Sequence, residues 1–200
     1  MARLLEEAVA PTLDLNRLRQ VSRDPVSIKA RGSSSGGGGG SPGRRRVPDA
    51  YSKMIGWLGE YFVYQQLRAV CPDFDVTHWR SCARERFGYD PGDDALGYDF
   101  EYPDVAGLLT GRSGAPRCLI EVKSAAQDCR DSFEMSMNEW DVAHRCHCDP
   151  DYGVYVIVRV DNVASKPQIA DLLVDPVELQ RQGVLNYSSR NLLVVVGRAR

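Results

Sequence analysis

Two short segments near the middle of the chain alternate apolar and polar positions, a pattern that predicts β-strands over residues 97–102 and 118–124. The polar positions of these strands include Asp99, Glu121 and Lys123. If the two strands pair, these three side chains converge on one patch. Two carboxylates and an ammonium group can hold a hard divalent metal and position a water molecule. An acid-x-Lys sequence on an exposed strand face is common, however, and usually marks an ordinary solvated face.

Helical spacing of apolar residues predicts a first helix from Asp49 to Cys71, and Pro72 ends it. A second helix opens at Ser136, which forms a capping-box pattern with Glu139. Apolar or alternating stretches predict further strands over residues 74–78, 152–160, 169–174 and 192–196, with a short helix after Asp175. The predicted order is therefore αβββαβ with C-terminal additions. This order indicates an α/β or α+β fold with a mixed central sheet flanked by helices.

The chain divides into an N-terminal segment and one folded domain. Residues 1–47 lack the apolar periodicity of a core and include a Gly/Ser-rich linker, so we expect this segment to be disordered. Residues 48–200 are predicted to form the domain. The linker ends in Arg44-Arg45-Arg46, which is weak evidence for a nuclear signal or a phosphate contact.

Charge and hydropathy narrow the classes of function. Residues 51–200 hold 16 Lys or Arg and 22 Asp or Glu, a net charge of −6, which is unusual for a high-affinity nucleic-acid binder. Arg80, Arg84 and Arg86 could form a local basic rim, although a solvated loop explains these residues better. No run of about 18 apolar residues is present, so the sequence predicts no membrane contact.

Cysteine usage fits a reducing compartment. The N-terminus carries acids where a signal peptide needs an apolar run, and the spacing of the six cysteines does not resemble a disulfide framework. A cluster of soft metal ligands consists of His144, Cys146, His147 and Cys148. Zinc sites usually leave two or more residues between paired cysteines, and no second pair lies nearby, so the role of this cluster stays open.

The pattern of Asp99 followed by Glu121-x-Lys123 resembles the PD-(D/E)XK nuclease superfamily. Over residues 50–196 the chain also resembles the C-terminal domain of the plant NO VEIN proteins. The blocks that carry this resemblance are Gly59-Glu60, Gly97-Tyr98-Asp99-Phe100, Ile120-Glu121-Val122-Lys123-Ser124 and Phe133-x-Met135-Ser136-x-Asn138-Glu139-Trp140. One departure is the long connection over residues 103–116, which either covers the site or loops away from it.

The resemblance implies a restriction-endonuclease-like core and a nuclease dependent on Mg²⁺ or Mn²⁺. Asp99 and Glu121 would ligate the metal together with the backbone carbonyl of Val122. Lys123 would position or deprotonate the attacking water. The resemblance also implies a nuclear setting and a nucleic-acid partner, with DNA favoured over RNA. An alternative is a catalytically inactive module that binds nucleic acid or a protein partner, or a purely structural domain.

Three further residues have two readings each. Glu60 would reach the outer shell of the metal, or it is an acid on the surface of the first helix. Ser124 would help to hold a phosphate, or it is an ordinary serine at a strand end. Glu139 fits its capping-box role with Ser136 better than a catalytic role.

Overall fold

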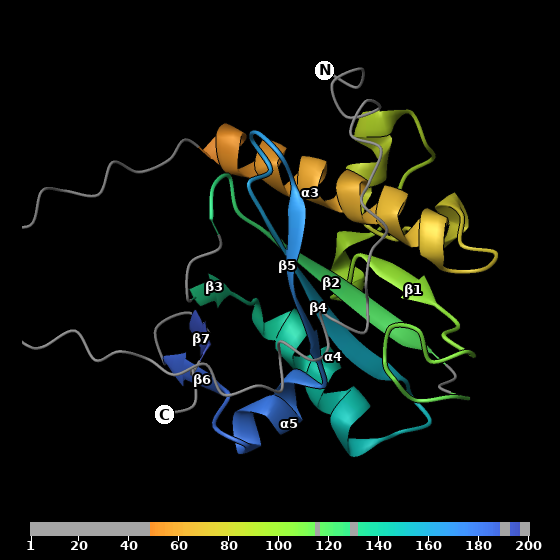
Figure 1. Cartoon of the computed structure of the whole chain (residues 1–200), viewed down its shortest axis with the longest axis vertical. Coiled ribbons are helices and arrows are strands. Elements are labelled where there is room, and N and C mark those ends of the chain that lie inside the picture. The colour runs from red at the N-terminus through yellow and green to blue at the C-terminus, as the bar shows by residue number, and fades with distance from the viewer. Residues whose placement is uncertain (1–48, 115–116, 129–131, 189–192, 197–200) are drawn as a thin grey trace, which may run out of the picture.

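The computed structural model describes residues 49–114, 117–128, 132–188 and 193–196, so the predicted N-terminal segment and its linker lie outside the described residues. The main feature is a mixed four-stranded sheet with strand order β1-β2-β4-β5 (Figure 1). Strands β2 and β4 are parallel, and the other two pairs are antiparallel. The strands are β1 (Phe100–Tyr102), β2 (Cys118–Ser124), β4 (Val154–Asp161) and β5 (Gln168–Val174).

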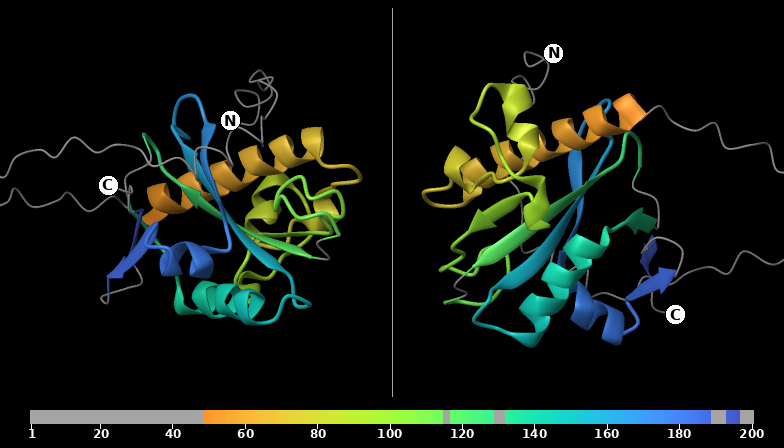
Figure 2. Two further views of the ribbon diagram at one scale, coloured as in Figure 1. Left: turned by 60° about the horizontal axis from the view of Figure 1, so that its bottom comes forward. Right: turned by 180° about the vertical axis from the view of Figure 1, so that it is seen from behind.

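Helices cover both faces of this sheet (Figure 2). Helix α3 (Asp49–Val70) lies on one face, and α4 (Met137–Cys148) and α5 (Pro176–Arg181) lie on the other. All eight residues of β4 are buried, as expected for a central strand covered on both faces. The fold is therefore α+β, with a mixed sheet flanked by helices. None of the described helices is long and apolar enough to span a membrane.

Side chains of β2 alternate between the two halves of the core. Ile120 and Val122 pack in the cluster under α3, whereas Leu119 packs in the cluster under α4 and α5. Because successive strand residues point to opposite faces, Glu121 and Lys123 lie on the α4 side of the sheet.

A smaller antiparallel sheet has the strand order β3-β7-β6. Its strands are β3 (Ser132–Glu134), β7 (Leu193–Val196) and β6 (Leu185–Ser188). Strand β7 falls within the strand predicted over residues 192–196. The sequence did not predict β3 and β6, because strands this short carry little alternation. Of the three strands that precede α4, only β1 and β2 therefore belong to the main sheet, and β3 belongs to the second one.

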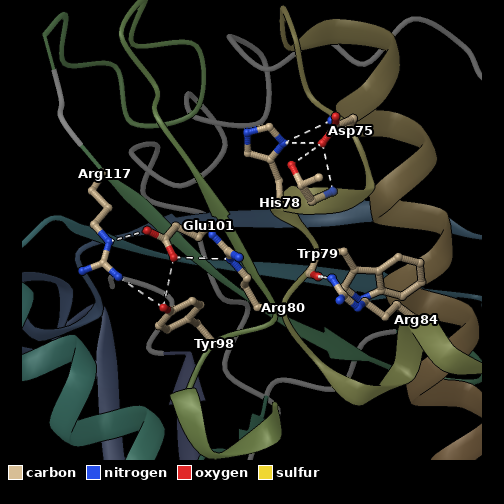
Figure 3. Close-up of polar contacts among 9 residues, drawn as sticks. Asp75, His78, Trp79, Arg80, Arg84, Tyr98, Glu101 and Arg117 are labelled. Atoms are coloured by element: carbon tan, nitrogen blue, oxygen red, sulfur yellow. Dashed lines mark hydrogen bonds and ion pairs between the residues drawn. The ribbon is translucent and has the colours of Figure 1, made fainter. Parts of the chain in front are cut away.

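The prediction of a strand over residues 74–78 is wrong. Val76–His78 form a 3-10 turn, because the Asp75 carboxylate accepts the Thr77 N–H at 2.9 Å and His78 Nδ1 accepts the Asp75 N–H at 3.1 Å (Figure 3). This local capping box outweighs the alternation of the side chains. The next residue, Trp79, still makes an isolated antiparallel bridge to Phe100.

Helix α3 approaches β2 most closely at Gly59. A Cβ atom at this position would lie only 2.7 Å from Ser124 Cβ and would also meet Ser124 Oγ. Glycine is therefore needed so that the helix can cross the end of β2. The same contact places Glu60, the next residue of α3, beside that end of the sheet.

We predict that Gly59→Ala destabilises the domain by about 1–3 kcal/mol, because the added methyl group overpacks the α3–β2 contact. Gly56→Ala is the matched control, since nothing lies within 4 Å of a Cβ at that position of the same helix. The control should stabilise the domain by about 0.5–1 kcal/mol, because alanine favours the helix. Urea unfolding of both variants measures the difference, and equal effects would show that α3 does not approach β2 in this way.

Candidate functional site

Asp99 lies directly before β1 and is bound to the backbone on both sides of Glu121. The Asp99 N–H donates to the Ile120 carbonyl at 2.8 Å, and the Asp99 carboxylate accepts the Val122 N–H at 2.8 Å. In an extended strand the N–H and C=O of one residue point to the same edge. The Val122 carbonyl therefore points to the edge of β2 at which the Asp99 carboxylate lies.

The turn that precedes Asp99 is held by residues of α4 and β4. Gly97 adopts a left-handed conformation with φ of 77°, and its carbonyl accepts the buried Tyr155 hydroxyl at 2.8 Å. The Asn138 side-chain amide donates to the Ala95 carbonyl at 2.8 Å. These contacts join the Gly97-Tyr98-Asp99-Phe100 block to the block that opens α4, so the two segments together fix the position of Asp99.

Lys123 bridges two carboxylates on the α4 side of the sheet. Its ammonium nitrogen lies 2.8 Å from Glu121 Oε1 and 2.6 Å from Glu139 Oε2. Glu139 also accepts the Ser136 N–H at 3.1 Å, and its own N–H donates to Ser136 Oγ at 3.2 Å. The predicted capping box is therefore confirmed. Sequence reasoning missed the second contact of Glu139, which makes it part of the candidate site.

Glu60 faces the site from the other helix and is partly buried. Its carboxylate accepts hydrogen bonds from Trp79 Nε1 at 3.1 Å and from the Ser81 hydroxyl. The structure thus rejects the description of Glu60 as an exposed acid on a helix surface. Ser81 also donates its backbone N–H to the Asp99 carbonyl at 3.2 Å, so it links Glu60 to the Asp99 segment. The sequence carries no local signal for Trp79 or Ser81.

Ser124 is not brought together with Lys123. The alternation of β2 puts Ser124 on the α3 face, where it contacts Gly59. Its buried Oγ has no hydrogen-bond partner among the described residues. The predicted phosphate contact of Ser124 stays a prediction, and the observed role of this residue is close packing against α3.

Burial and mutual repulsion make the carboxylates reluctant to ionise together. Burial and the nearby Glu60 charge raise the pKa of Asp99 well above its usual value. Burial and the Asp99 charge raise the pKa of Glu121 in the same way. Burial raises the pKa of Glu60 to about 7, although hydrogen bonds from Ser81 and Trp79 lower it in part. Full ionisation of these acids would therefore place more negative charge in the site than its one lysine neutralises.

Lys123 remains a cation in this environment. Burial lowers the pKa of its ammonium group, but the charges of Glu121 and Glu139 outweigh burial and the pKa is raised overall. Lys123 therefore donates hydrogen bonds and positive charge to the site, and its raised pKa favours the positioning role over that of a base.

The oxygen atoms of Asp99, Glu121 and Val122 fit a magnesium ion better than a metal that is bound by side chains alone. Within the described ranges, no group of three or more His, Cys, Asp or Glu side chains is arranged to hold a metal ion. The set at β2 is instead two carboxylates, Asp99 and Glu121, with the carbonyl of Val122. Mg²⁺ is commonly bound by one or two carboxylates and completes its shell with water. The residues therefore fit a hydrated Mg²⁺ ion, and direct ligation by both acids stays a prediction.

The soft ligands of α4 do not converge. Cys146 is buried in the core beneath α4, and His147 Nδ1 lies 3.1 Å from both carboxylate oxygens of Asp175. His144 Nδ1 lies 3.6 Å from the exposed Cys148 thiol. These four residues thus have three separate surroundings, and the arrangement does not support zinc.

The three arginines of the predicted basic rim all have partners within the domain. Arg84 donates to the carbonyls of Trp79, Asp90 and Pro91, at 2.6, 2.5 and 2.7 Å respectively. Arg86 lies over the Trp57 ring at 4.4 Å. Arg80 pairs with Glu101, which also binds Arg117 and Tyr98 (Figure 3). These contacts favour structural roles over a free phosphate-binding rim.

The long connection after β1 does not cover the site. Tyr102, at the end of β1, pairs with Cys118 at the start of β2, so residues 103–114 leave the sheet at the end away from Lys123. Of the two predicted alternatives, the structure supports the one in which the connection loops away.

We predict that Glu60→Gln changes the pH dependence of stability. The unfolded acid loses its proton near pH 4.5, whereas folded Glu60 keeps it up to about 7, so charging of Glu60 weakens the fold as pH rises between these values. Glutamine stays neutral, and its carbonyl can accept both hydrogen bonds. The variant should therefore be about 1–3 kcal/mol more stable than the wild type at pH 8 and nearly equal at pH 4.5. Urea unfolding from pH 4.5 to 8 tests this, with the exposed Glu134→Gln as the control; a gain that does not depend on pH would contradict it.

Comparison with known proteins places the chain in one family. No curated protein and no solved structure matches it significantly. The family model described as "Protein NO VEIN, C-terminal" matches residues 59–172, more than half of the chain. The matched region begins at Gly59 and contains Asp99, Glu121 and Lys123. This chain therefore belongs to the NO VEIN C-terminal family.

Proposed function

We propose that the domain is a Mg²⁺-dependent nuclease of the PD-(D/E)XK type, which hydrolyses phosphodiester bonds. The observation that carries the proposal is the arrangement around Val122. The Asp99 carboxylate is bound to the Val122 N–H, Glu121 precedes Val122, and Lys123 follows it with its ammonium group on Glu121. A helix on each side of the mixed sheet is compatible with the core of that superfamily.

The excess of acids over cations supports a divalent cation as a component of the site. Asp99 and Glu121 would hold the ion with the Val122 carbonyl, and Glu60 lies near enough to raise the pKa of Asp99. When bound, the ion supplies positive charge to a phosphoryl oxygen and lowers the pKa of a bound water. Manganese would substitute for magnesium at such oxygen ligands.

Lys123 would position a water or a phosphate oxygen and stabilise negative charge. Its raised pKa argues against removal of a proton from water. A protonated lysine at this place would donate hydrogen bonds to a water or a phosphate oxygen and stabilise the negative charge that develops in the transition state. Glu139 would hold the ammonium group in place, since it contacts Lys123 at 2.6 Å from a helix that packs on the sheet.

The substrate we favour is DNA, in the nuclear setting that the family resemblance implies. The internal partners of Arg80, Arg84 and Arg86 mean that much of the positive charge at the phosphate would come from the metal and Lys123. We therefore expect weak binding of nucleic acid without a divalent ion.

A second candidate is a catalytically inactive module that binds nucleic acid or a protein partner. The observation that favours it is the closed ion-pair arrangement of Lys123 with Glu121 and Glu139, all three of which are less than one-fifth exposed. Such a network can serve the stability and specificity of the fold alone.

Metal binding gives the first test of the two candidates. We predict that MgCl₂ or MnCl₂ raises the melting temperature of the wild type and leaves that of Asp99→Asn nearly unchanged. The side-chain carbonyl of the introduced asparagine can still accept the Val122 N–H, so this variant keeps the local hydrogen bond and loses the charge. Saturation at about 100 times Kd corresponds to roughly 2.7 kcal/mol of stabilisation. Asp141→Asn, at an exposed position of α4, is the matched control and should respond as the wild type does.

Cleavage is measured on single- and double-stranded DNA and RNA with Mg²⁺ or Mn²⁺. We expect Lys123→Met to lower the rate by a factor on the order of 10² or more, because charge stabilisation in the transition state is lost. The same change leaves Glu121 and Glu139 without their partner and should cost about 1–3 kcal/mol in urea unfolding. A wild type that binds no divalent ion and cleaves no substrate would leave the inactive module as the function.

A further inference from the structure

A cavity of about 240 Å³ lies at the end of the sheet where β4 begins, away from the carboxylates. One wall comes from the loop after β1, with Arg112 and Ser113. The opposite wall comes from the end of α4 and the start of α5, with His147 and Asp175. The lining also includes Val154 and Tyr155 of β4.

The loop that carries Arg112 and Ser113 is built around one buried acid. Asp104 is fully buried, and its carboxylate accepts hydrogen bonds from the N–H groups of Leu108, Leu109 and Thr110 and from the Thr110 hydroxyl. Charge-assisted bonds of this kind are strong. The loop is therefore a fixed wall of the cavity, although it lies at the surface.

The opposite wall is fixed by an imidazole with a defined tautomer. His147 Nδ1 lies 3.1 Å from both oxygens of Asp175, and Arg181 Nη1 lies 3.2 Å from His147 Nε2. Arginine only donates, so Nε2 accepts and Nδ1 carries the hydrogen that Asp175 accepts. Asp175 also accepts the Glu178 N–H at 3.1 Å. The one carboxylate among the cavity-lining residues thus already has its donors.

Two further lining residues, Arg112 and Ser113, carry side-chain hydrogen-bond donors. Arg112 is exposed. Among the described residues, no carboxylate oxygen lies within 4.0 Å of its guanidinium group, the distance of an ion pair. Ser113, also exposed, adds a hydroxyl next to it. A guanidinium group prefers the paired oxygens of a carboxylate or a phosphate. The volume corresponds to that of about eight water molecules, which limits the ligand to a compact one.

We propose that this cavity binds a small organic anion, a carboxylate or a phosphate monoester, with its acid group at Arg112 and Ser113. Its apolar body would lie against Pro150 and Tyr155, which line the cavity. This cavity is separate from the carboxylates of the proposed nuclease site. It lies where β2 and β4 begin, whereas Lys123 lies near the other end of β2. Tyr155 joins the two regions, since it lines the cavity and its hydroxyl binds the Gly97 carbonyl two residues before Asp99.

Calorimetric titration of the full chain in EDTA, with no nucleic acid, tests this inference without any dependence on the proposed nuclease activity. The probes are benzoate and phenyl phosphate, and benzamide is the neutral control with the shape of benzoate. We expect one or both anions to bind and benzamide to bind at least tenfold more weakly. Binding of one anion alone identifies the acid group that the site prefers.

The variant Arg112→Gln should weaken binding of the anion by about tenfold or more, because a charge-assisted pair is lost. Lys166→Gln makes the same charge change at an exposed position of the β4–β5 turn and should leave the affinity unchanged. Amide chemical shifts locate the ligand, since Gly114 and Gly153 line the cavity and Gly56 of α3 does not. Equal affinity for benzoate and benzamide, equal affinity in Arg112→Gln, shifts confined to other regions, or no binding at all would overturn the proposal.

Discussion

Lys123 is the cation on which the arrangement of the partly buried acids depends. Burial of a carboxylate is expensive unless a positive charge or hydrogen-bond donors accompany it. Glu121 and Glu139 share the Lys123 ammonium group, whereas Asp99 has the Val122 N–H and Glu60 has the donors of Trp79 and Ser81. The acids still outnumber the one lysine, and burial together with their mutual repulsion raises the pKa values of Asp99 and Glu121. A fold that needed only stability would gain from fewer acids at this place. This surplus of acids supports the proposed binding of a divalent cation at the site.

The sequence blocks that carry the family resemblance acquire separate meanings in three dimensions. Gly59 permits the close crossing of α3 over Ser124, and Gly97 permits the left-handed turn before Asp99. Asn138 binds that turn from the first turn of α4, one residue before Glu139 reaches Lys123. One short segment at the start of α4 thus positions both the acid at the edge of β2 and the lysine on its face. This coupling explains why segments 43 residues apart in the chain, at Ala95 and Asn138, act together.

Local signals were sufficient for much of the fold. The capping box of Ser136 and Glu139, the cap at Asp175 and the apolar run of β4 each depend on neighbours in sequence, and each was predicted correctly. The alternation at Phe74 to His78 misled, because a capping box decided the local conformation. Contacts between distant residues left no signal: Glu60 meets Trp79 and Ser81 about twenty positions away, and Glu139 meets Lys123 sixteen positions away. The candidate acids could thus be named from the sequence, but their partners could not.

The sheet itself explains why chemistry would gather at one place on β2. Strand β1 pairs with β2 only through Phe100, Glu101 and Tyr102, so the edge of β2 is released from strand pairing at Val122. The Asp99 carboxylate binds the freed N–H, and the carbonyl of the same residue is directed to that edge. A longer β1 would have consumed both groups in the ladder. Because β1 begins only at Phe100, the Val122 N–H is left for the Asp99 carboxylate, and the Val122 carbonyl is directed to the same edge.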